Sequence, residues 1–358
     1  MLAKYQVIAQ ELKEKIQAGE LQKQDSLPSE LKLQEHYQVS RATVRQALNV
    51  LVKEGYIEKT KGAGSFVIDA YQKPRVTPGL KTIGVIMTYL SDYIFPDIIR
   101  GIEKELRQQG YGLLLASTNN DFQQEEACLQ KMLAYHVDGL IVEPTKSNEF
   151  NPNLSYYLSL KEAGIPVVMM NASYEALKLP KVVLDDVLAG QQATDYLLQK
   201  GHRHLALLSK TDDLQGKLRL EGFIHAHEKA HLAFQPSAVV PFTTENRLAV
   251  VESLAQRLAA VDNIVTGVVC YNDECANLLV EALSTHGKRV PQDISIVGLD
   301  DSNLAVTGRV PLTSIAHPKE AMGIACGQWI IEAVSKQKIG GDILFTPKII
   351  QRDSVRKL

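Results

Sequence analysis

The chain has 358 residues, of which 45% are hydrophobic and 22% charged, and its formal net charge is −2. A length above the roughly 100 to 200 residues of one domain indicates at least two domains, and this composition excludes a disordered chain. The charge excludes a globally basic protein, and residues 1–70 hold ten Lys and Arg against nine Asp and Glu. Any charge that binds nucleic acid must therefore be gathered on one face.

Two features predict a cytoplasmic protein with no membrane partner. The N-terminal segment MLAKYQVIAQELKEKIQ carries charges at helical spacing, whereas a signal peptide needs an uninterrupted apolar run. No stretch approaches the roughly 20 apolar residues that cross a bilayer. The cysteines show no metal-finger spacing, and we expect reduced, mostly buried thiols at Cys128, Cys270, Cys275 and Cys326.

The first 67 residues show the order cap, helix, turn, cap, helix and hairpin. A first helix is predicted from about Tyr5 to Ile16, on the periodicity of its apolar residues. Ser29 is a typical N-cap for a second helix that ends near Tyr37, and Ser40 caps a third helix with the sequence RATVRQALNVLVKEG. This order predicts a helix-turn-helix.

The third helix divides into a buried and an exposed face. Its predicted buried stripe consists of Val44, Ala47, Leu48 and Leu51. Arg41 and Arg45 lie four residues apart on the opposite side. Two guanidinium groups on the first turns of such a helix suit the O6 and N7 atoms of guanine in the major groove, so this helix is predicted to read DNA.

Other polar residues of this region suit contacts to DNA as well. Hydroxyl groups and helix-terminal N–H groups at Ser29, Ser40 and Thr43 can bind phosphates, and Glu30 can accept a hydrogen bond from a cytosine amino group. The segment YIEKTKGAGSFV predicts two short strands around a glycine-bearing tip. The full set of predicted DNA-contacting residues is Lys4, Ser29, Glu30, Ser40, Arg41, Thr43, Arg45, Gln46, Lys61, Gly62 and Gly64.

A family resemblance supports this prediction. The sequence PSELKLQEHYQVSRATVRQALNVLVKEGYIEKTKGAGSFV resembles the winged helix of the GntR family over about forty residues. It departs from the family at Lys32, where arginine is frequent, and a lysine there still suits a phosphate contact. The resemblance implies a winged helix-turn-helix domain over residues 1–69.

Beyond Val67, charges, two prolines and a glycine indicate a linker over residues 70–81. The remainder, residues 82–358, alternates short apolar runs with helical segments such as FPDIIRGIEKELRQQG and DECANLLVEALSTHGK. Eight strands are predicted, at 83–87, 111–117, 137–144, 165–171, 181–186, 204–209, 267–273 and 294–301. This alternation predicts an α/β region of doubly wound parallel sheets, and the number of strands favours two lobes.

The large region resembles the regulatory domain of the LacI/GalR type, which shares its fold with type I periplasmic sugar-binding proteins. The residues that carry the match are IGVI at 83–86, Arg219-x-x-Gly222-Phe223, Tyr271-Asn272-Asp273, VPQDISIVGLDD at 290–301 and LTSI at 312–315. A GntR head on a LacI-type body is the arrangement of the AraR-type family of L-arabinose repressors, which the chain resembles throughout. This resemblance implies a small sugar effector, L-arabinose in this family.

The resemblance also implies a set of effector-binding residues at the strand ends. Either Asn120 or Asp121 is expected after the second strand. The complete expected set is Tyr89, Tyr93, Asn120, Glu143, Asn171, Asp185, Arg219, Asn272, Asp300 and His317. Carboxylates, amides and a guanidinium can satisfy sugar hydroxyls, which both donate and accept hydrogen bonds. An ordinary capping or sheet-end role is the alternative for each residue, since Asp and Asn favour such positions.

These patterns predict a sugar-responsive transcription repressor that is not an enzyme and has no cofactor or metal. It is expected to bind a palindromic operator as a homodimer. One alternative is a repressor of the same architecture that responds to another sugar. A second is a zinc-dependent α/β enzyme, because His227-Glu228-Lys229-Ala230-His231 satisfies H-E-x-x-H. No third-ligand motif follows it, and a solvated helix face is the interpretation we favour.

Overall fold

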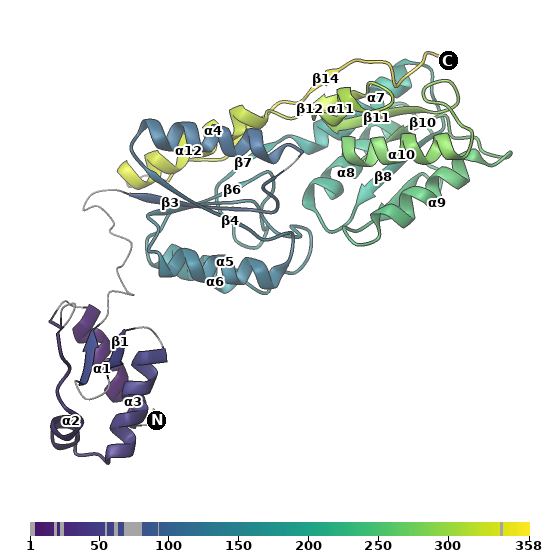
Figure 1. Ribbon diagram of the computed structural model, residues 1–358. Coiled ribbons are helices and arrows are strands. Elements are labelled where there is room, and N and C mark those ends of the chain that lie inside the picture. The colour runs from purple at the N-terminus through teal and green to yellow at the C-terminus, as the bar shows by residue number, and fades with distance from the viewer. Residues whose placement is uncertain are drawn as a thin grey trace. The chain divides into compact units, whose positions relative to one another are not determined.

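The chain divides into two compact units, Met1–Gly79 and Leu80–Leu358, each described by itself (Figure 1). The computed structural model describes residues 4–17, 20–21, 25–53, 56–60, 64–67, 81–91, 93–336 and 339–358. The predicted linker lies almost wholly outside these residues. Within the described part, no helix is both long enough and apolar enough to cross a membrane.

The described residues of the small unit form three helices and a pair of antiparallel strands. The elements are α1 (Lys4–Gln17), α2 (Glu30–Tyr37), α3 (Arg41–Lys53), β1 (Ile57–Thr60) and β2 (Gly64–Val67). The two strands are antiparallel, with Ile57 opposite Val67 and Thr60 opposite Gly64. Ser26 forms an isolated bridge to Phe66 on the outer side of the hairpin. The hairpin is thereby joined to the segment that precedes α2.

The predicted apolar faces build the core of the small unit. Val44, Ala47, Leu48 and Leu51 of α3 are all buried, as the sequence predicts. They pack in one cluster with Ile8 and Leu12 of α1 and Leu33 of α2. Because this stripe is fully used by the core, the opposite side of α3 remains exposed.

The first lobe of the large unit is a six-stranded parallel sheet of order β13-β7-β6-β5-β3-β4. Helices α4 and α12 cover one face, and α5 and α6 cover the other (Figure 1). The strands are β3 (Thr82–Met87), β4 (Gly112–Ser117), β5 (Gly139–Val142), β6 (Val167–Met170), β7 (Lys181–Leu184) and β13 (Ile343–Phe345). The helices are α4 (Phe95–Gln108), α5 (Phe122–Ala134), α6 (Leu154–Glu162) and α12 (Lys319–Lys336).

The second lobe repeats this plan with the order β14-β12-β11-β10-β8-β9. Only the pairing of β14 with β12 is antiparallel in this sheet. The strands are β8 (Leu205–Lys210), β9 (Val239–Phe242), β10 (Gly267–Val269), β11 (Ser295–Asp300), β12 (Thr313–Ala316) and β14 (Lys348–Ile350). The helices are α7 (Asp186–Gln199), α8 (Leu214–Lys229), α9 (Arg247–Ala259), α10 (Asp273–Thr285) and α11 (Leu304–Thr307).

The chain passes between the lobes three times, from β7 into α7, from β12 into α12, and from β13 into β14. In each lobe the first five strands have the order 2-1-3-4-5 of a doubly wound sheet, which places a ligand outside the carboxyl ends of the strands. The carboxyl ends of both sheets face the space between the lobes. The fold therefore directs two sets of strand ends toward one site.

The eight predicted strands are all present, with bounds one or more residues shorter than predicted in most cases. Strands β9, β12, β13 and β14 were not among them. Pro241 interrupts the apolar pattern of β9, an edge strand, while β13 and β14 are three-residue edge strands and β12 is rich in hydroxyl residues. The four cysteines are free and buried, as predicted.

Glycines allow the paired helices of the large unit to touch at the backbone. A Cβ atom on Gly190 of α7 would lie 2.2 Å from the carbonyl oxygen of Arg219. One on Gly222 of α8 would lie 2.0 Å from the carbonyl oxygen of Val187. Because neither approach leaves room for a methyl group, these two glycines fix the distance between α7 and α8, and with it the position of Arg219.

We predict that Gly222→Ala destabilises the large unit. Overpacking costs about 1 to 3 kcal/mol, which exceeds the gain of about 1 kcal/mol that alanine brings to a helix interior. Urea unfolding of the full chain measures the change in the free energy of unfolding. Gln199→Ala on the exposed face of α7 is the control and should change it by less than about 0.5 kcal/mol. Equal midpoints for the two variants would contradict the close contact.

Candidate functional site

The exposed side of α3 carries the two predicted arginines. The side chain of Arg41 is 64% exposed and that of Arg45 57% exposed. They project from the first two turns of the second helix of the helix-turn-helix, where such domains contact base edges. This arrangement makes α3 a candidate recognition helix.

Glu30 of α2 joins both arginines. Its carboxylate accepts hydrogen bonds from Nε of Arg41 at 2.8 Å and from Nε of Arg45 at 3.1 and 3.2 Å. The hydrogen bond from Arg41 is the largest effect on the pKa of Glu30, which lies below its usual value. In this structure Glu30 therefore orients the guanidinium groups, a role that the sequence did not predict.

The predicted caps are present at the helix starts. The hydroxyl of Ser29 accepts a hydrogen bond from the Lys32 N–H group at 3.3 Å. That of Ser40 accepts one from the Thr43 N–H group at 3.2 Å. The predicted residues Lys4, Ser29, Ser40, Gln46 and Gly64 are exposed and Thr43 is half-buried. Lys61 and Gly62, predicted at the wing tip, lie outside the described residues.

A cavity of about 540 Å³ lies between the lobes of the large unit. This volume falls within the roughly 300 to 1,000 Å³ of small-molecule sites. Nine of the ten predicted effector residues line it: Tyr89, Tyr93, Asn120, Glu143, Asn171, Arg219, Asn272, Asp300 and His317. They come from both lobes and follow the strand ends that the fold directs toward each other.

The tenth residue, Asp185, is displaced by one position from the expected place. The structure puts the neighbouring Asp186 on the cavity wall. The carboxylate of Asp185 instead accepts a hydrogen bond from the Leu188 N–H group at 2.9 Å and caps α7. Asp121, the alternative to Asn120, likewise caps a helix, α5, through the N–H groups of Gln123 and Gln124. In both cases the carboxylate that follows the strand caps the next helix.

Arg219 forms the charged centre of the cavity wall. Its Nε atom lies 2.8 Å from Asp186 Oδ1, and one of its terminal nitrogens lies 3.3 Å from Asp300 Oδ1. It also donates to the carbonyl oxygen of Tyr271. Although burial disfavours its charge, Asp186 and Asp300 keep the pKa of Arg219 above its usual value. The three side chains are almost fully buried, and the two carboxylates compensate the charge of the guanidinium.

Tyr93 connects this centre to the other lobe. Its hydroxyl donates to Asp300 Oδ2 at 2.6 Å and accepts a hydrogen bond from the Asp273 N–H group at 3.2 Å. Tyr93 precedes α4 of the first lobe, whereas both partners belong to the second. The two lobes thus share a hydrogen-bond network at the cavity.

A second network runs along the first lobe. Glu143 accepts hydrogen bonds from the N–H group of Thr88 at 2.8 Å and from the side-chain amide of Asn171 at 2.6 Å. Nε2 of His317 lies 3.1 Å from the Asn171 oxygen, which fixes that ring nitrogen as the donor. Burial raises the pKa of Glu143 and lowers that of His317 to about 4. Asn171 therefore connects a neutral imidazole to a hydrogen-bonded carboxyl group.

Sequence reasoning missed several residues of the cavity wall. Besides Asp186 they include Lys210, Asp213, Arg247, Tyr271 and Glu274. Tyr271 belonged to a quoted family motif and also follows the cavity-facing end of β10, which could have identified it. Lys210 is a charged residue at the carboxyl end of an apolar strand. In an open α/β sheet, the carboxyl ends of the strands border the ligand site.

Each cation of the cavity wall is paired with a carboxylate. Lys210 Nζ lies 2.6 Å from Asp213, and Arg247 lies 2.7 Å from Glu274. Arg219 is held by Asp186 and Asp300, as described above. Because the wall holds three cations against five acidic side chains, no cation is left without a carboxylate, and the wall offers hydroxyls, amides and carboxylates to a ligand. Such a surface suits an uncharged polyhydroxyl compound better than an anion.

The H-E-x-x-H motif does not form a metal site in the structure. His227 is buried, its Nδ1 atom lies 2.9 Å from the Phe223 carbonyl oxygen, and its ring packs on that of Phe223. His231 lies beyond the end of α8, in a left-handed conformation with φ of 53°. The two histidines therefore do not share one helical face, and the described residues hold no cluster of three potential metal ligands.

Both units match known families. The bacterial regulatory proteins of the gntR family match residues 4–67, and the periplasmic binding protein-like domain matches residues 194–355. An arabinose metabolism transcriptional repressor of Geobacillus stearothermophilus is 43% identical over 363 residues, which cover 100% of this chain and 99% of that protein. Another of Halalkalibacterium halodurans is 42% identical, with 99% and 97% covered.

Solved structures resemble the large unit. The transcription regulator CcpA of Lactococcus lactis has a TM-score of 0.69 and 25% identity, over 77% of this chain and 100% of that one. A LacI family transcriptional regulator of Enterococcus faecium with bound ribose has a TM-score of 0.67 and 24% identity, over 78% and 100%. These similarities confirm the predicted two-lobed α/β fold.

We predict that removing the central guanidinium destabilises the large unit. Arg219→Ala leaves two buried carboxylates without their cation, at a cost of about 3 to 5 kcal/mol. The control is Arg289→Ala, whose side chain is 73% exposed in its pair with Asp293 and which should cost about 0 to 1 kcal/mol. Urea unfolding measures both. Similar losses for the two variants would show that the buried charges are solvated in some other way.

Proposed function

Because this chain belongs to the family of arabinose metabolism transcriptional repressors, we propose that it binds operator DNA through its helix-turn-helix and releases that DNA when a small sugar occupies the cleft cavity. The family consists of transcriptional repressors and not of enzymes, which confirms the expectation drawn from the sequence. The observation that carries the proposal is the combination, in one chain, of an exposed arginine pair on a recognition helix with a polar cavity between two lobes.

We propose that Arg41 and Arg45 read bases and that the caps Ser29 and Ser40, together with Thr43 in the first turn of α3, bind phosphates. The hydrogen bonds of both arginines to Glu30 use Nε, so the terminal nitrogens of each guanidinium remain the edge that a guanine can meet. Two copies are proposed to bind a palindromic operator in the cytoplasm, since a single recognition helix reads only one half-site.

We propose L-arabinose as the effector. The names of the two relatives support arabinose metabolism, and the pairing of Lys210, Arg219 and Arg247 with carboxylates supports a neutral sugar over a sugar phosphate. The rings of Tyr89 and Phe95, with centroids 5.7 Å apart, border the same cavity and offer apolar faces to the C–H groups of a sugar.

We predict that Arg41→Ala and Arg45→Ala each weaken operator binding by about 5- to 150-fold, which corresponds to the loss of one bidentate contact to guanine. The probe is a duplex selected by the wild-type chain from a random-sequence library, and fluorescence anisotropy measures its affinity. Arg257→Ala, an exposed arginine of α9, is the control and should leave the affinity unchanged. The selected sequences should be palindromic. Wild-type affinity in both arginine variants would refute the assignment of α3 as the recognition helix.

We predict that L-arabinose binds the full chain in calorimetry and weakens its complex with the selected duplex, whereas D-ribose 5-phosphate does neither. Asp300→Asn should lower the affinity for L-arabinose by about 10- to 150-fold, the effect of losing a hydrogen bond to a charged group. Its control is Asp301→Asn, the adjacent carboxylate, which pairs with Arg352 at 2.6 Å and is not part of the cavity wall. Tighter binding of the phosphorylated sugar would refute a neutral effector.

A further inference from the structure

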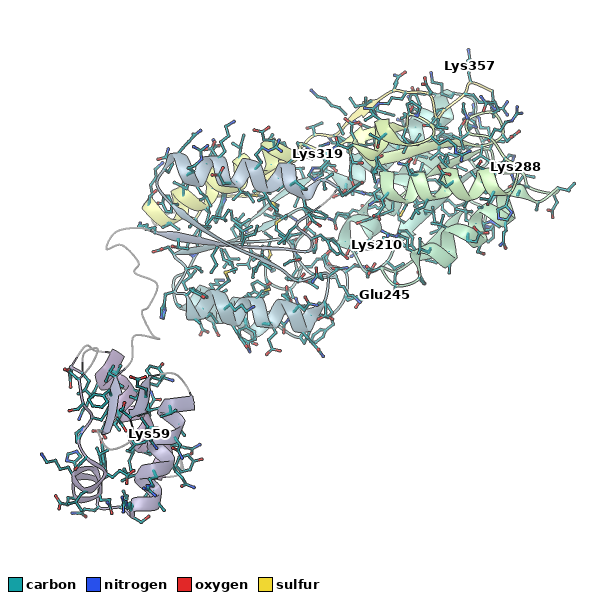
Figure 2. All side chains as sticks on the ribbon, in the orientation of Figure 1. Lys59, Lys210, Glu245, Lys288, Lys319 and Lys357 are labelled. Carbon is teal, nitrogen blue, oxygen red and sulfur yellow. The ribbon has the colours of Figure 1, made fainter. Side chains whose placement is uncertain are left out.

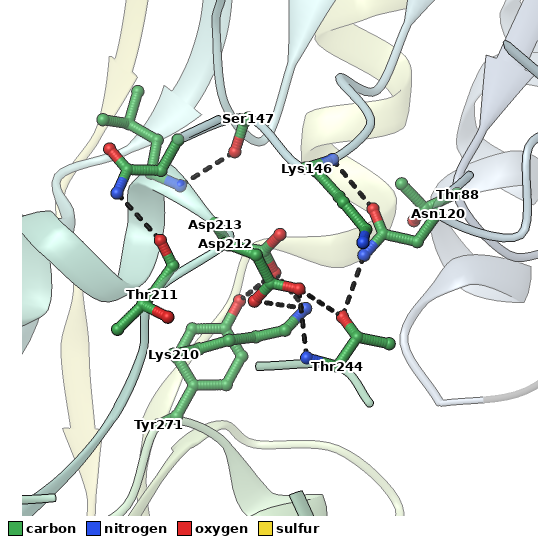
Figure 3. Close-up of polar contacts among 12 residues, drawn as sticks. Thr88, Asn120, Lys146, Ser147, Lys210, Thr211, Asp212, Asp213, Thr244 and Tyr271 are labelled. Atoms are coloured by element: carbon green, nitrogen blue, oxygen red, sulfur yellow. Dashed lines mark hydrogen bonds and ion pairs between the residues drawn. The ribbon is translucent and has the colours of Figure 1, made fainter. Parts of the chain in front are cut away.

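Loops from the two lobes meet across the mouth of the cleft, in addition to the contacts inside the cavity. From the first lobe come Asn120, which precedes α5, and residues 146–148, which follow β5. From the second lobe come residues 211–214, which follow β8, and residues 244–245, which follow β9. We call this set of residues the clasp. Figure 3 shows most of it at close range, and Figure 2 places Glu245 beside the cleft between the lobes.

One part of the clasp joins Ser147 and Asn148 of the first lobe to backbone groups of the second lobe. The side-chain amide of Asn148 donates a hydrogen bond to the Thr211 carbonyl oxygen at 2.8 Å. The backbone N–H group of Asn148 donates one to the Asp212 carbonyl oxygen at 3.1 Å. The Leu214 N–H group donates to the Ser147 hydroxyl at 2.8 Å in a buried contact. These bonds require a defined register of the two loops, which a chance surface contact does not.

The other part joins side chains across the cleft. The Asn120 amide donates to the Thr244 hydroxyl at 3.0 Å, and that hydroxyl donates to Asp212 at 2.6 Å (Figure 3). Lys146 Nζ lies 2.7 Å from Glu245 Oε1. The hydrogen bond from Lys146 lowers the pKa of Glu245 to about 2, so the pair is charged at neutral pH.

Asn120 serves the clasp with both ends of its amide. Its oxygen accepts a hydrogen bond from the Lys146 N–H group at 2.9 Å, while its nitrogen is bonded to Thr244. The residue lines the cavity, yet the polar atoms of its side chain form hydrogen bonds to the protein. The hydrogen bonds of Asn120 within the clasp therefore explain why a polar side chain is found here, without a direct contact to the sugar.

A buried carboxylate holds the first-lobe loop of the clasp in place. Glu125 of α5 is fully buried and accepts hydrogen bonds from the hydroxyl of Tyr174 at 2.6 Å and from the amide of Asn151 at 2.8 Å. The Tyr174 hydroxyl accepts a further bond from the Thr145 N–H group at 2.8 Å. The loop is thus anchored on both sides of residues 146–148, and its contacts with the second lobe have a rigid support.

The clasp lies on the side of the cleft opposite the three crossings of the chain. The crossings leave or enter β7, β12, β13 and β14, which lie at one edge of the two sheets, whereas the clasp segments follow β4, β5, β8 and β9, toward the other edge. If the crossings act as the hinge, the clasp is the part of the interface that separates furthest when the lobes open. Few contacts at such a position can control opening.

We propose that the clasp is a latch, formed by the protein alone, that sets how far the cleft is closed before any sugar binds. Its contacts are made by the two lobes alone, so they favour the closed arrangement irrespective of what the cavity contains. The apparent affinity for a ligand of the closed state is scaled by the fraction of closed molecules. The clasp residues therefore tune the sensitivity to the effector from outside the first layer of sugar contacts.

The first test measures the distance between the lobes in the full chain without sugar. Spin labels on Lys131→Cys of α5 and Ser253→Cys of α9 occupy exposed positions, while the four native cysteines are buried. Asn148→Ala/Glu245→Ala should raise the ratio of open to closed molecules by about 2- to 70-fold, as expected from the loss of one hydrogen bond and one exposed ion pair.

The matched control is Asn263→Ala/Glu320→Ala, which removes the same two kinds of contact within single lobes. Asn263 donates to the Val265 carbonyl oxygen at 2.9 Å, and Glu320 pairs with Lys104 at 3.4 Å. The control should leave the distance between the labels unchanged. An unchanged distance in the clasp variant, or the same change in both, would overturn the proposal.

A charge reversal separates the latch from a general loss of stability. Lys146→Glu should open the cleft by placing two carboxylates together, and Lys146→Glu/Glu245→Lys should close it again. Circular dichroism and urea unfolding confirm that each variant is folded. If the double variant stays as open as the single one, the ion pair has no role in closing and the proposal fails.

The consequence for the effector rests on the function proposed above and is measured separately. In a calorimetric titration, L-arabinose should bind the opened variants more weakly than the wild-type chain. The fold loss of affinity should equal the fold decrease in the fraction of closed molecules. If the wild-type chain binds no L-arabinose while the label distances behave as predicted, the effector proposal fails and the latch stands. If L-arabinose binds equally well to open and closed variants, the latch does not control sensitivity.

Discussion

The large unit depends on how the charge of Arg219 is buried. Taking a guanidinium out of water costs several kcal/mol, and here the cost is offset by Asp186 at the start of α7 and Asp300 at the end of β11. These elements must meet at one point for the charges to compensate, and Gly190 and Gly222 allow α7 and α8 to approach closely enough. Tyr93 then extends the same network into the other lobe. The cavity is therefore shaped by the need to compensate the buried guanidinium charge as well as by the packing of its apolar walls.

Much of this architecture could be predicted from the sequence because buried strands are nearly continuous apolar runs. Strands such as β9, which has a proline at an edge, give no such run and were missed. Nine cavity residues were expected from resemblance, but Asp185 was chosen where Asp186 is found. Two adjacent carboxylates at a strand end are equivalent in sequence, and only the direction of the chain entering α7 decides which one caps the helix. Lys210 and its partner Asp213 acquire a role only through the tertiary arrangement.

In the small unit, too, some features could be predicted from the sequence and others could not. Periodicity placed Arg41 and Arg45 on the exposed side of α3, whereas Glu30 was expected to read a base. A carboxylate 11 and 15 residues away, on another helix, is not linked to either arginine by any periodic pattern, so its hydrogen bonds to both emerged only in the structure. The pairing has a physical consequence for recognition. Arginines that are already oriented lose less side-chain entropy on binding DNA, and their charge is partly balanced while the helix is free.

The strength of the clasp determines whether the large unit can act as a switch. Moving a population from 1:99 to 99:1 requires about 5.5 kcal/mol of differential binding. An exposed ion pair contributes about 0 to 1 kcal/mol and a hydrogen bond about 0.5 to 1.5 kcal/mol, so the contacts at the cleft mouth together contribute about 2 to 7 kcal/mol, which is of the same order. A much stronger clasp would hold the lobes together permanently and leave the effector nothing to change. A clasp in the lower part of this range leaves a large share to the hydroxyls of the bound sugar, which is what a regulator of metabolism requires.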